Sequence, residues 1–142
     1  MAVAISSATG ISGAPIIYEN STVSATAAGG TINFDALTQS VLQYTTSASG
    51  NWTLNIRGSS TTSLNTLMAT GQTVTVLFMA AQGATAYYNN VLQIDGTTVT
   101  PKWLNGTAPT AGNINSTDVY TYAIVKTGGN TYNVFASLVK FA

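Results

Sequence analysis

The sequence predicts an all-β protein: an antiparallel β-sandwich or jelly roll with one short helix at residues 60–69 and an extended N-terminal arm. Three observations lead to this fold class. Charged residues make up only 6% of the chain, and polarity comes from Ser, Thr and Asn, which favour strands and turns over helices. Apolar and polar residues alternate in several segments, as along a half-buried strand. Turn signals separate these segments at intervals of about 10 residues.

Two segments of the chain show the strand pattern most clearly. In residues 51–57, the side chains of Trp52, Leu54 and Ile56 point to one face and polar side chains point to the other. Residues 73–81 begin with the same alternation and then become apolar on both faces. The first pattern predicts a strand with one buried face, and the second predicts a central strand.

Two pairs of strands are expected to form hairpins. Residues 127–130 read TGGN, and Asp95-Gly96 is a two-residue turn signal, so Gly stands in both turns where a positive φ is needed. The strands that these turns join are residues 118–126 with 131–141, and residues 91–94 with 97–99. Strands with such spacing favour a sandwich over alternating strand–helix units.

One segment departs from the strand pattern. Residues 60–69 place Leu64, Leu67 and Met68 at helical spacing behind Ser and Thr candidates for an N-cap, which predicts a single short helix. Before the body of the domain, residues 1–30 are rich in Ala, Ser, Thr and Gly. We interpret residues 1–30 as an arm, extended over 1–20 with room for a strand at 21–27, and residues 31–142 as the sandwich domain.

The charge distribution limits the partners of the chain. The four basic residues Arg57, Lys102, Lys126 and Lys140 balance four acidic ones, and the net charge is zero. The basic residues do not cluster, so phosphate-mediated binding to nucleic acid is not expected. So little charge also gives little colloidal self-repulsion. The chain is therefore either a soluble domain hydrated by Ser, Thr and Asn or, as we favour, a subunit of an assembly.

Few residues suited to catalysis or metal binding are present. The chain has neither Cys nor His, which removes the commonest general base, the commonest metal ligand and most nucleophilic dyads. Ser137 and Lys140 match a Ser-x-x-Lys motif, but they would lie on opposite faces of a strand. Asp95 and Asp118 are a conceivable carboxylate or calcium pair, although both positions suit turn or capping roles better. We therefore expect no enzyme activity, no cofactor and no bound metal.

Targeting signals are likewise not evident. The first residues are small and apolar, but they have no basic segment and are interrupted by Gly10, Gly13 and Pro15. The longest apolar run, residues 76–81, is far shorter than the roughly 18 residues that a membrane span needs. We expect neither a signal peptide nor a membrane segment.

Aromatic residues near turns are the candidate contact residues. Tyr87 and Tyr88 directly precede two asparagines, and Lys102 and Trp103 lie in a proline-containing stretch that leaves a strand. Tyr and Trp commonly anchor both protein interfaces and carbohydrate sites. Core packing, subunit contact and glycan binding are all open for these residues. For residues 99–113 we favour a crossover at the end of the sandwich, with Trp103 covering the core or a neighbouring subunit, over a ligand loop.

From residue 31 to the C-terminus, an ordered set of segments resembles a β-rich virion domain of tailed bacteriophages, of the kind found in cyanophage tail-fibre-like and capsid decoration proteins. The segments that carry the resemblance are TINF at 31–34, GNWTLNIRGS at 50–59, SLNTLM at 63–68, QGATAYYN at 82–89, DGT at 95–97 and VTPKWLNGTAPTAGN at 99–113. The resemblance implies a structural role on the particle, with no catalysis and no cofactor.

Two functions are compatible with this resemblance. In the one we favour, the protein decorates or cements the capsid surface through its arm and β surfaces, because no fibrous shaft precedes the domain. Its partners would be the major capsid protein and further copies of itself, with trimers as the resemblance implies. In the alternative, the domain is the tip of a tail fibre or head fibre and binds host glycans through Tyr87, Tyr88 and Trp103. Both functions predict a location on the virion surface, after assembly in the host cytoplasm.

Overall fold

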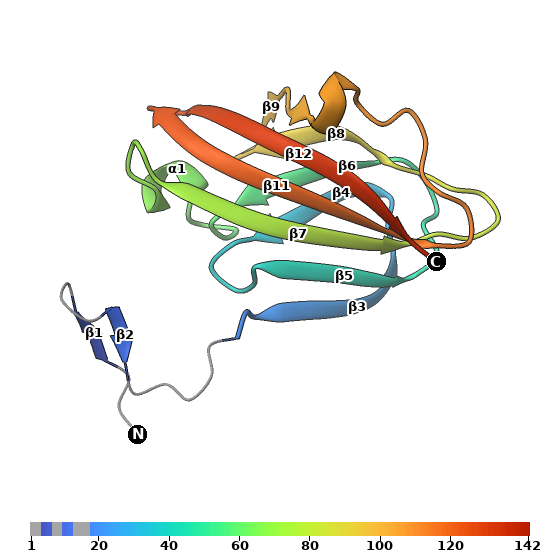
Figure 1. The fold of residues 1–142 in the computed structure, drawn as a ribbon, viewed down its shortest axis with the longest axis horizontal. Helices are drawn as coiled ribbons and strands as arrows, with labels where there is room; N and C mark the ends of the chain where they lie inside the picture. The colour runs from blue at the N-terminus through green and yellow to red at the C-terminus, as the bar shows by residue number, and fades with distance from the viewer. Residues whose placement is uncertain (1–3, 7–9, 13–17) are drawn as a thin grey trace.

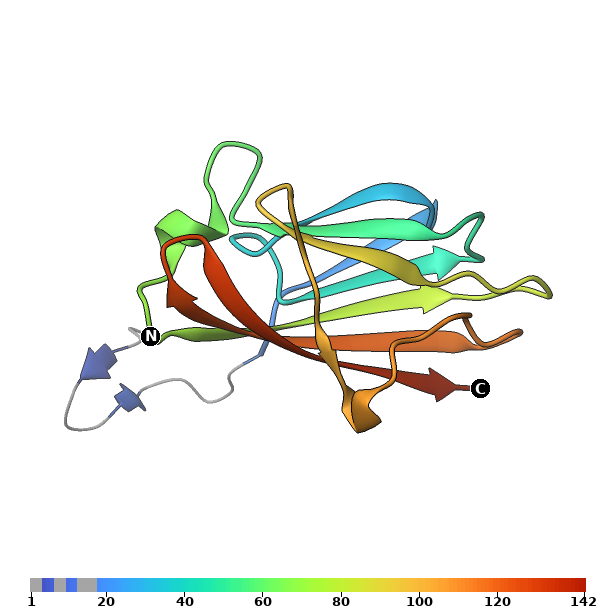
Figure 2. The same cartoon turned by 90° about the horizontal axis from the view of Figure 1, so that it is seen from above.

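The computed structural model describes residues 4–6, 10–12 and 18–142. The chain forms a two-layer β-sandwich, with a six-stranded sheet below and a four-stranded sheet above in Figure 2. Outside the sandwich, β1 (Ala4–Ser6) and β2 (Gly10–Ser12) pair antiparallel (Figure 1). The predicted all-β, two-sheet fold is thus confirmed.

The strands of the two sheets alternate along residues 21–94 of the chain. The six-stranded sheet has the order β10-β12-β11-β7-β5-β3, and the four-stranded sheet has the order β4-β6-β8-β9. The bounds are β3 Ser21–Ala27, β4 Gly30–Asp35, β5 Val41–Thr46, β6 Trp52–Arg57, β7 Thr73–Ala81, β8 Asn89–Ile94, β9 Thr97–Val99, β10 Lys102–Trp103, β11 Thr117–Gly128 and β12 Thr131–Phe141.

The sandwich is confirmed, but the antiparallel pairing predicted for it, and with it the jelly roll, is wrong for residues 21–94. The chain passes from one sheet to the other after each strand, so β3, β5 and β7 pair in parallel in one sheet, and β4, β6 and β8 pair in parallel in the other. Only β7–β11, β11–β12 and β8–β9 are antiparallel within the sandwich. The period-two pattern fixes which face each side chain occupies, but parallel and antiparallel strands share that pattern.

Backbone hydrogen bonds between small residues hold the corners, which are the connections where the chain crosses from one sheet to the other. The amide of Ser49 donates to the carbonyl of Ala28 (2.8 Å), and the amide of Ala48 donates to the carbonyl of Ala81 (2.9 Å). Both Ala28 and Ala48 are buried. Small buried corner residues allow the chain to cross between the sheets in a few residues, where a hairpin would have returned it to the same sheet.

Both predicted hairpins and the predicted helix are present. In the hairpin β8–β9, Asp95 (φ 51°) and Gly96 (φ 79°) both have the positive φ of a tight two-residue turn. Helix α1 (Leu64–Leu67) lies within the expected range, and the Ser63 side chain caps it by accepting from the Thr66 amide (3.0 Å). No helix among the described residues is long and apolar enough to cross a membrane.

The sandwich begins earlier than residue 31. Strand β3 pairs with β5 and forms one edge of the six-stranded sheet, and β4 begins at Gly30, so residues 21–30 belong to the sandwich. The strand allowed by the sequence at residues 21–27 is therefore confirmed. Most of the extended arm expected over residues 1–20 lies outside the described residues.

The core lies between the sheets and is rich in aromatic rings. Trp52, Leu54 and Ile56 are fully buried, as their alternation predicted. The Trp52 ring lies 5.6 Å from Phe78 and 5.7 Å from Tyr120, measured between ring centroids. These edge-on and tilted contacts between rings join the four-stranded sheet to the six-stranded one.

Candidate functional site

The crossover from β9 to β11 builds one corner of the molecule. After Pro101, β10 adds to β12 in parallel, and Trp103 lies level with Ala136. The chain then turns through a short 3-10 helix, η1 (Leu104–Gly106), in which Asn105 has a φ of 59°. Residues 102–103 thus lie at the edge of the six-stranded sheet, because β10 is its last strand.

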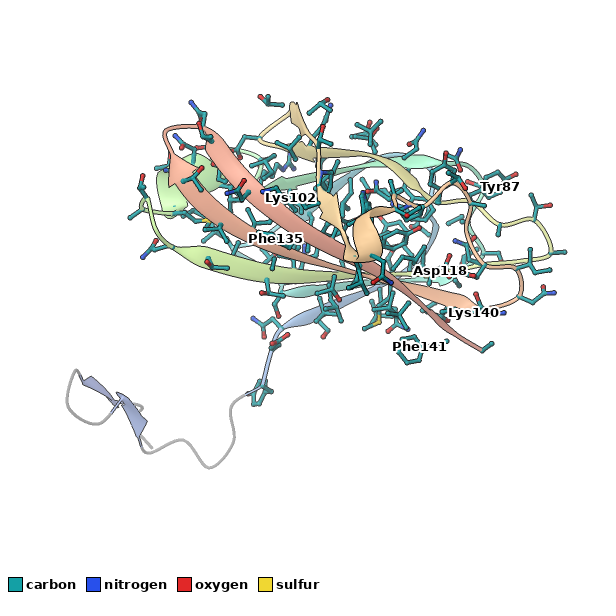
Figure 3. The ribbon with its side chains drawn as sticks, turned by 45° about the horizontal axis from the view of Figure 1, so that its top comes forward. Tyr87, Lys102, Asp118, Phe135, Lys140 and Phe141 are labelled. Carbon is teal, nitrogen blue, oxygen red and sulfur yellow. The ribbon has the colours of Figure 1, made fainter. Side chains whose placement is uncertain are left out.

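Trp103 packs inward from this corner. Its ring meets the ring of buried Tyr122 edge-on, with centroids 6.2 Å apart, and the residue is half-buried against the core. Next to it, Lys102 is exposed, and its Nζ lies 5.5 Å from the centroid of the Phe135 ring (Figure 3). Trp103 thus covers the core, as one of the sequence interpretations held, and Lys102 lies over an exposed aromatic ring.

Tyr87 and Tyr88 lie elsewhere, in the connection between β7 and β8. The Gln82 side chain holds the backbone of Tyr87 on both sides: its Oε1 accepts from the Tyr87 amide (3.0 Å) and its Nε2 donates to the Tyr87 carbonyl (2.6 Å). The Tyr88 amide donates to the Asn51 side chain (3.1 Å). Figure 3 places Tyr87 well away from Lys102, so these two candidate residues do not form one site.

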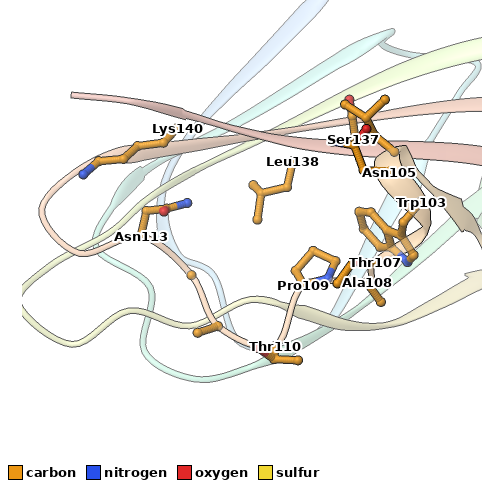
Figure 4. Close-up of a pocket in the computed structure, with 13 residues that line it drawn as sticks. Trp103, Asn105, Thr107, Ala108, Pro109, Thr110, Asn113, Ser137, Leu138 and Lys140 are labelled. Atoms are coloured by element: carbon orange, nitrogen blue, oxygen red, sulfur yellow. The ribbon is translucent and has the colours of Figure 1, made fainter.

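A groove runs between the crossover and β12. This crossover groove has a volume of about 580 Å³, and Ser137, Leu138 and Lys140 of β12 form one side of it (Figure 4). Trp103 and residues 104–105 and 107–113 complete the lining. Of the four candidate residues, only Trp103 lines this groove. Lys102 lines the adjoining hollow beside Phe135.

The crossover is fastened to the Tyr87 segment by a buried carboxylate. Asp118 is fully buried, and its Oδ2 accepts from the Asn113 amide (3.0 Å) and from Gln82 Nε2 (3.2 Å). Its Oδ1 accepts from Asn113 Nδ2 (2.7 Å). At Gly112, a Cβ would lie 2.1 Å from the Tyr87 carbonyl oxygen, so only Gly allows this close approach. Asp118 therefore holds the crossover in place against the segment that contains Tyr87.

Asp95 has a comparable structural role at the other end of β11. Its two carboxylate oxygens accept from the amides of Leu64 (2.7 Å) and Asn65 (2.9 Å) at the start of α1. Buried Lys126 donates to the carbonyls of Asn65 and Met68 at the end of that helix. The structure thus does not bring Asp95 and Asp118 together as a pair. Among the described residues, no three acidic side chains form a group suited to a metal ion.

The buried tyrosines form a polar network inside the core. The Tyr122 hydroxyl donates to Asn89 Oδ1 (2.8 Å), and the Asn89 amide donates to the Tyr120 hydroxyl (3.3 Å). Burial raises the pKa of both tyrosines well above the usual range, so they stay neutral. Tyr120 and Tyr122 are core residues.

The outer face of the six-stranded sheet exposes several large apolar side chains among Ser, Thr, Asn and Gln, and we call it the apolar face. In one row across it, Val139, Val119 and Met79 occupy paired positions on β12, β11 and β7. Phe135, Val139 and Phe141 are 48%, 46% and 58% exposed. At the outward positions of its five longer strands the apolar face carries no charged residue, and Lys102 on β10 stands at its edge.

Sequence reasoning missed both the Asp118 fastening and the apolar face. The apolar face did leave a signal, because residues 73–81 and 118–126 carry apolar side chains on both faces of the strand. The hydrogen bonds of Asp118 to Asn113 and Gln82 join residues 5 and 36 positions apart, so the turn or capping role that the sequence favoured for Asp118 did not indicate these partners. No protein-family model matches the chain, and neither a curated protein nor a solved structure matches it.

Proposed function

We propose that this chain is a non-enzymatic structural protein of a bacteriophage particle, and that it decorates the capsid surface. The phage assignment rests on the resemblance of the sequence segments described above. The observation that carries the structural role is the apolar face. The partners would be the major capsid protein and other copies of the chain, and the location would be the surface of the virion.

The dimensions of the apolar face support this role. The six strands are 2 to 12 residues long and average about eight residues. Strands lie about 4.8 Å apart and rise about 3.3 Å per residue, so the sheet covers roughly 24 by 26 Å, or about 600 Å². A stable protein interface buries about 800 Å² on each partner. The apolar face is therefore close in size to one side of a standard interface.

The roles of the charged residues also support a structural function. Asp95, Asp118 and Lys126 each bind backbone or amide groups within the fold, and Arg57 pairs with Asp35. Such groups hold loops and a helix in place. A general acid or base would instead need a hydrogen-bonding path to a substrate.

The proposal is tested by locating the protein on intact particles. Cryo-electron microscopy of purified virions, together with quantitative mass spectrometry, should find it on the capsid at a fixed and high copy number. A protein found solely at the tail tip would contradict capsid decoration while leaving a structural role in place. A protein missing from purified particles would contradict both.

A fibre tip that binds host glycans is the second candidate, favoured by the polar crossover groove beside Trp103. Asn105, Asn113 and Lys140 offer hydrogen-bonding groups along that groove. This function predicts that Trp103→Ala reduces adsorption of the phage to its host, whereas Tyr88→Ala, at a residue that does not line the groove, does not. Equal adsorption by folded Trp103→Ala particles would contradict it.

A further inference from the structure

One edge of the six-stranded sheet is only partly covered. Strand β10 pairs with β12 at two positions, Phe135 and Ala136. Beyond Ala136, no described residue forms a strand or a backbone hydrogen bond on the side of β12 that faces away from β11. In an edge strand, every second residue leaves its backbone N–H and C=O free for an added strand.

The crossover groove runs along this open edge. Ser137, Leu138 and Lys140 line it from β12, and the crossover forms the opposite wall (Figure 4). An extended segment laid there would continue the strand position that β10 begins, beside Trp103. Pairing with β12 would supply main-chain hydrogen bonds, and the wall of the crossover would contact alternate side chains of the segment.

The charge around the groove selects among such segments. Lys140 lines the groove and Lys102 lies near its β10 end, and both side chains are exposed. Neither forms an ion pair within the described part of the chain, where the one ion pair joins Arg57 to Asp35. No carboxylate lines the groove. Lys140 is therefore the one charged residue in the lining of the groove, and an acidic partner segment complements it.

We propose that the crossover groove binds an extended, acidic peptide segment of a partner protein, which adds as a strand to β12 at residues 137–141. Main-chain pairing gives the segment its extended form, and Lys140 with Lys102 favours carboxylates at its ends. This site lies at the edge of the sheet and uses no residue of the apolar face other than those on β12 itself.

The test uses the whole protein and a synthetic probe, so its outcome is independent of where the protein lies on a particle. The probe is a blocked hexapeptide of alternating Thr and Val with Asp at both ends. At about 1 mM peptide, NMR should show shifted amide signals at residues 137–141 and 104–113, with slower hydrogen exchange at 137–141. A Lys-ended peptide should bind at least tenfold more weakly, and an N-methylated peptide should not bind.

Two matched variants test whether the charge of Lys140 acts locally at the groove. Lys140→Gln should weaken binding of the Asp-ended peptide about threefold, as for an exposed ion pair. Thr70→Glu makes the same change in net charge at the opposite end of the sheet and should leave binding unchanged. Because both residues are exposed, neither change should affect folding.

Three outcomes would overturn the proposal. The first is equal binding of the N-methylated peptide, which would exclude strand addition. The second is a shift of the same amides by a uronic-acid trisaccharide but not by the peptide, which would assign the groove to glycans. The third is no binding of either probe, which would leave Lys140 as a charge that protects the edge from pairing.

Discussion

The outer faces of the two sheets differ in whether their side chains find hydrogen-bond and ion-pair partners within the chain. On the four-stranded sheet, which we call the polar face, Asn55 Nδ2 donates to Asn33 Oδ1 (2.9 Å), and Arg57 Nε lies 2.6 Å from Asp35 Oδ1. The apolar face presents Val139, Val119 and Met79 at equivalent outward positions. Both faces are built from the same two-residue alternation, so the difference lies in side-chain chemistry and not in backbone geometry.

This difference indicates which face we expect to contact a partner. On the polar face, cross-strand amide and ion pairs satisfy one another within one copy of the chain. On the apolar face, half-buried Val and Met side chains gain free energy only when another surface removes them from water. We therefore expect substitutions on the apolar face to alter association and substitutions on the polar face to alter stability.

The largest expected effect comes from placing a charge on the apolar face. Val119→Glu puts a carboxylate in the middle of this face, and burying it unpaired in an interface would weaken attachment at least tenfold. The number of copies per particle, measured by mass spectrometry after incubation with particles that lack the protein, should fall accordingly. Gln93→Glu on the polar face makes the same change in net charge and should leave the copy number unchanged. Equal loss in both folded variants would remove the distinction between the faces.

A smaller effect is expected from the amide contacts of the polar face. Asn55 is 8% exposed, accepts from the Gly96 amide (2.8 Å) and donates to Asn33. Asn55→Ala leaves both partners unpaired and should lower the free energy of unfolding by about 1–3 kcal/mol, measured by urea denaturation. Asn33 is exposed, so Asn33→Ala should cost less than about 1 kcal/mol. A larger loss for Asn33→Ala than for Asn55→Ala would contradict this assignment.

Much of the fold was predictable because it depends on local patterns. Turn chemistry at Asp95-Gly96, helical spacing around Leu64 and the alternation around Trp52 each act within a few residues. The parallel winding was not predictable from these patterns. It depends on whether the chain crosses to the other sheet at a corner such as Ala48. The alternation of apolar and polar residues is the same in parallel and antiparallel strands, so it does not reveal this choice.

The candidate site was only partly predictable for a similar reason. The sequence indicated that residues 99–113 form a crossover and that Trp103 has a covering role, and the structure confirms both. It could not indicate that Tyr87 lies well away from Lys102, because their separation depends on the path of the crossover. Proximity of aromatic residues to turns does not predict that they share a surface.

The smallest expected effect comes from the ion pair of the polar face. The Arg57 and Asp35 side chains are 25% and 31% exposed, so water and salt screen their attraction. Arg57→Gln should lower the free energy of unfolding by about 0.5 kcal/mol at low salt. In about 1 M NaCl, where the Debye length is about 3 Å, wild type and variant should become nearly equal. A salt-independent loss above about 2 kcal/mol would mean that packing of the Arg57 stem, and not its charge, stabilises this face.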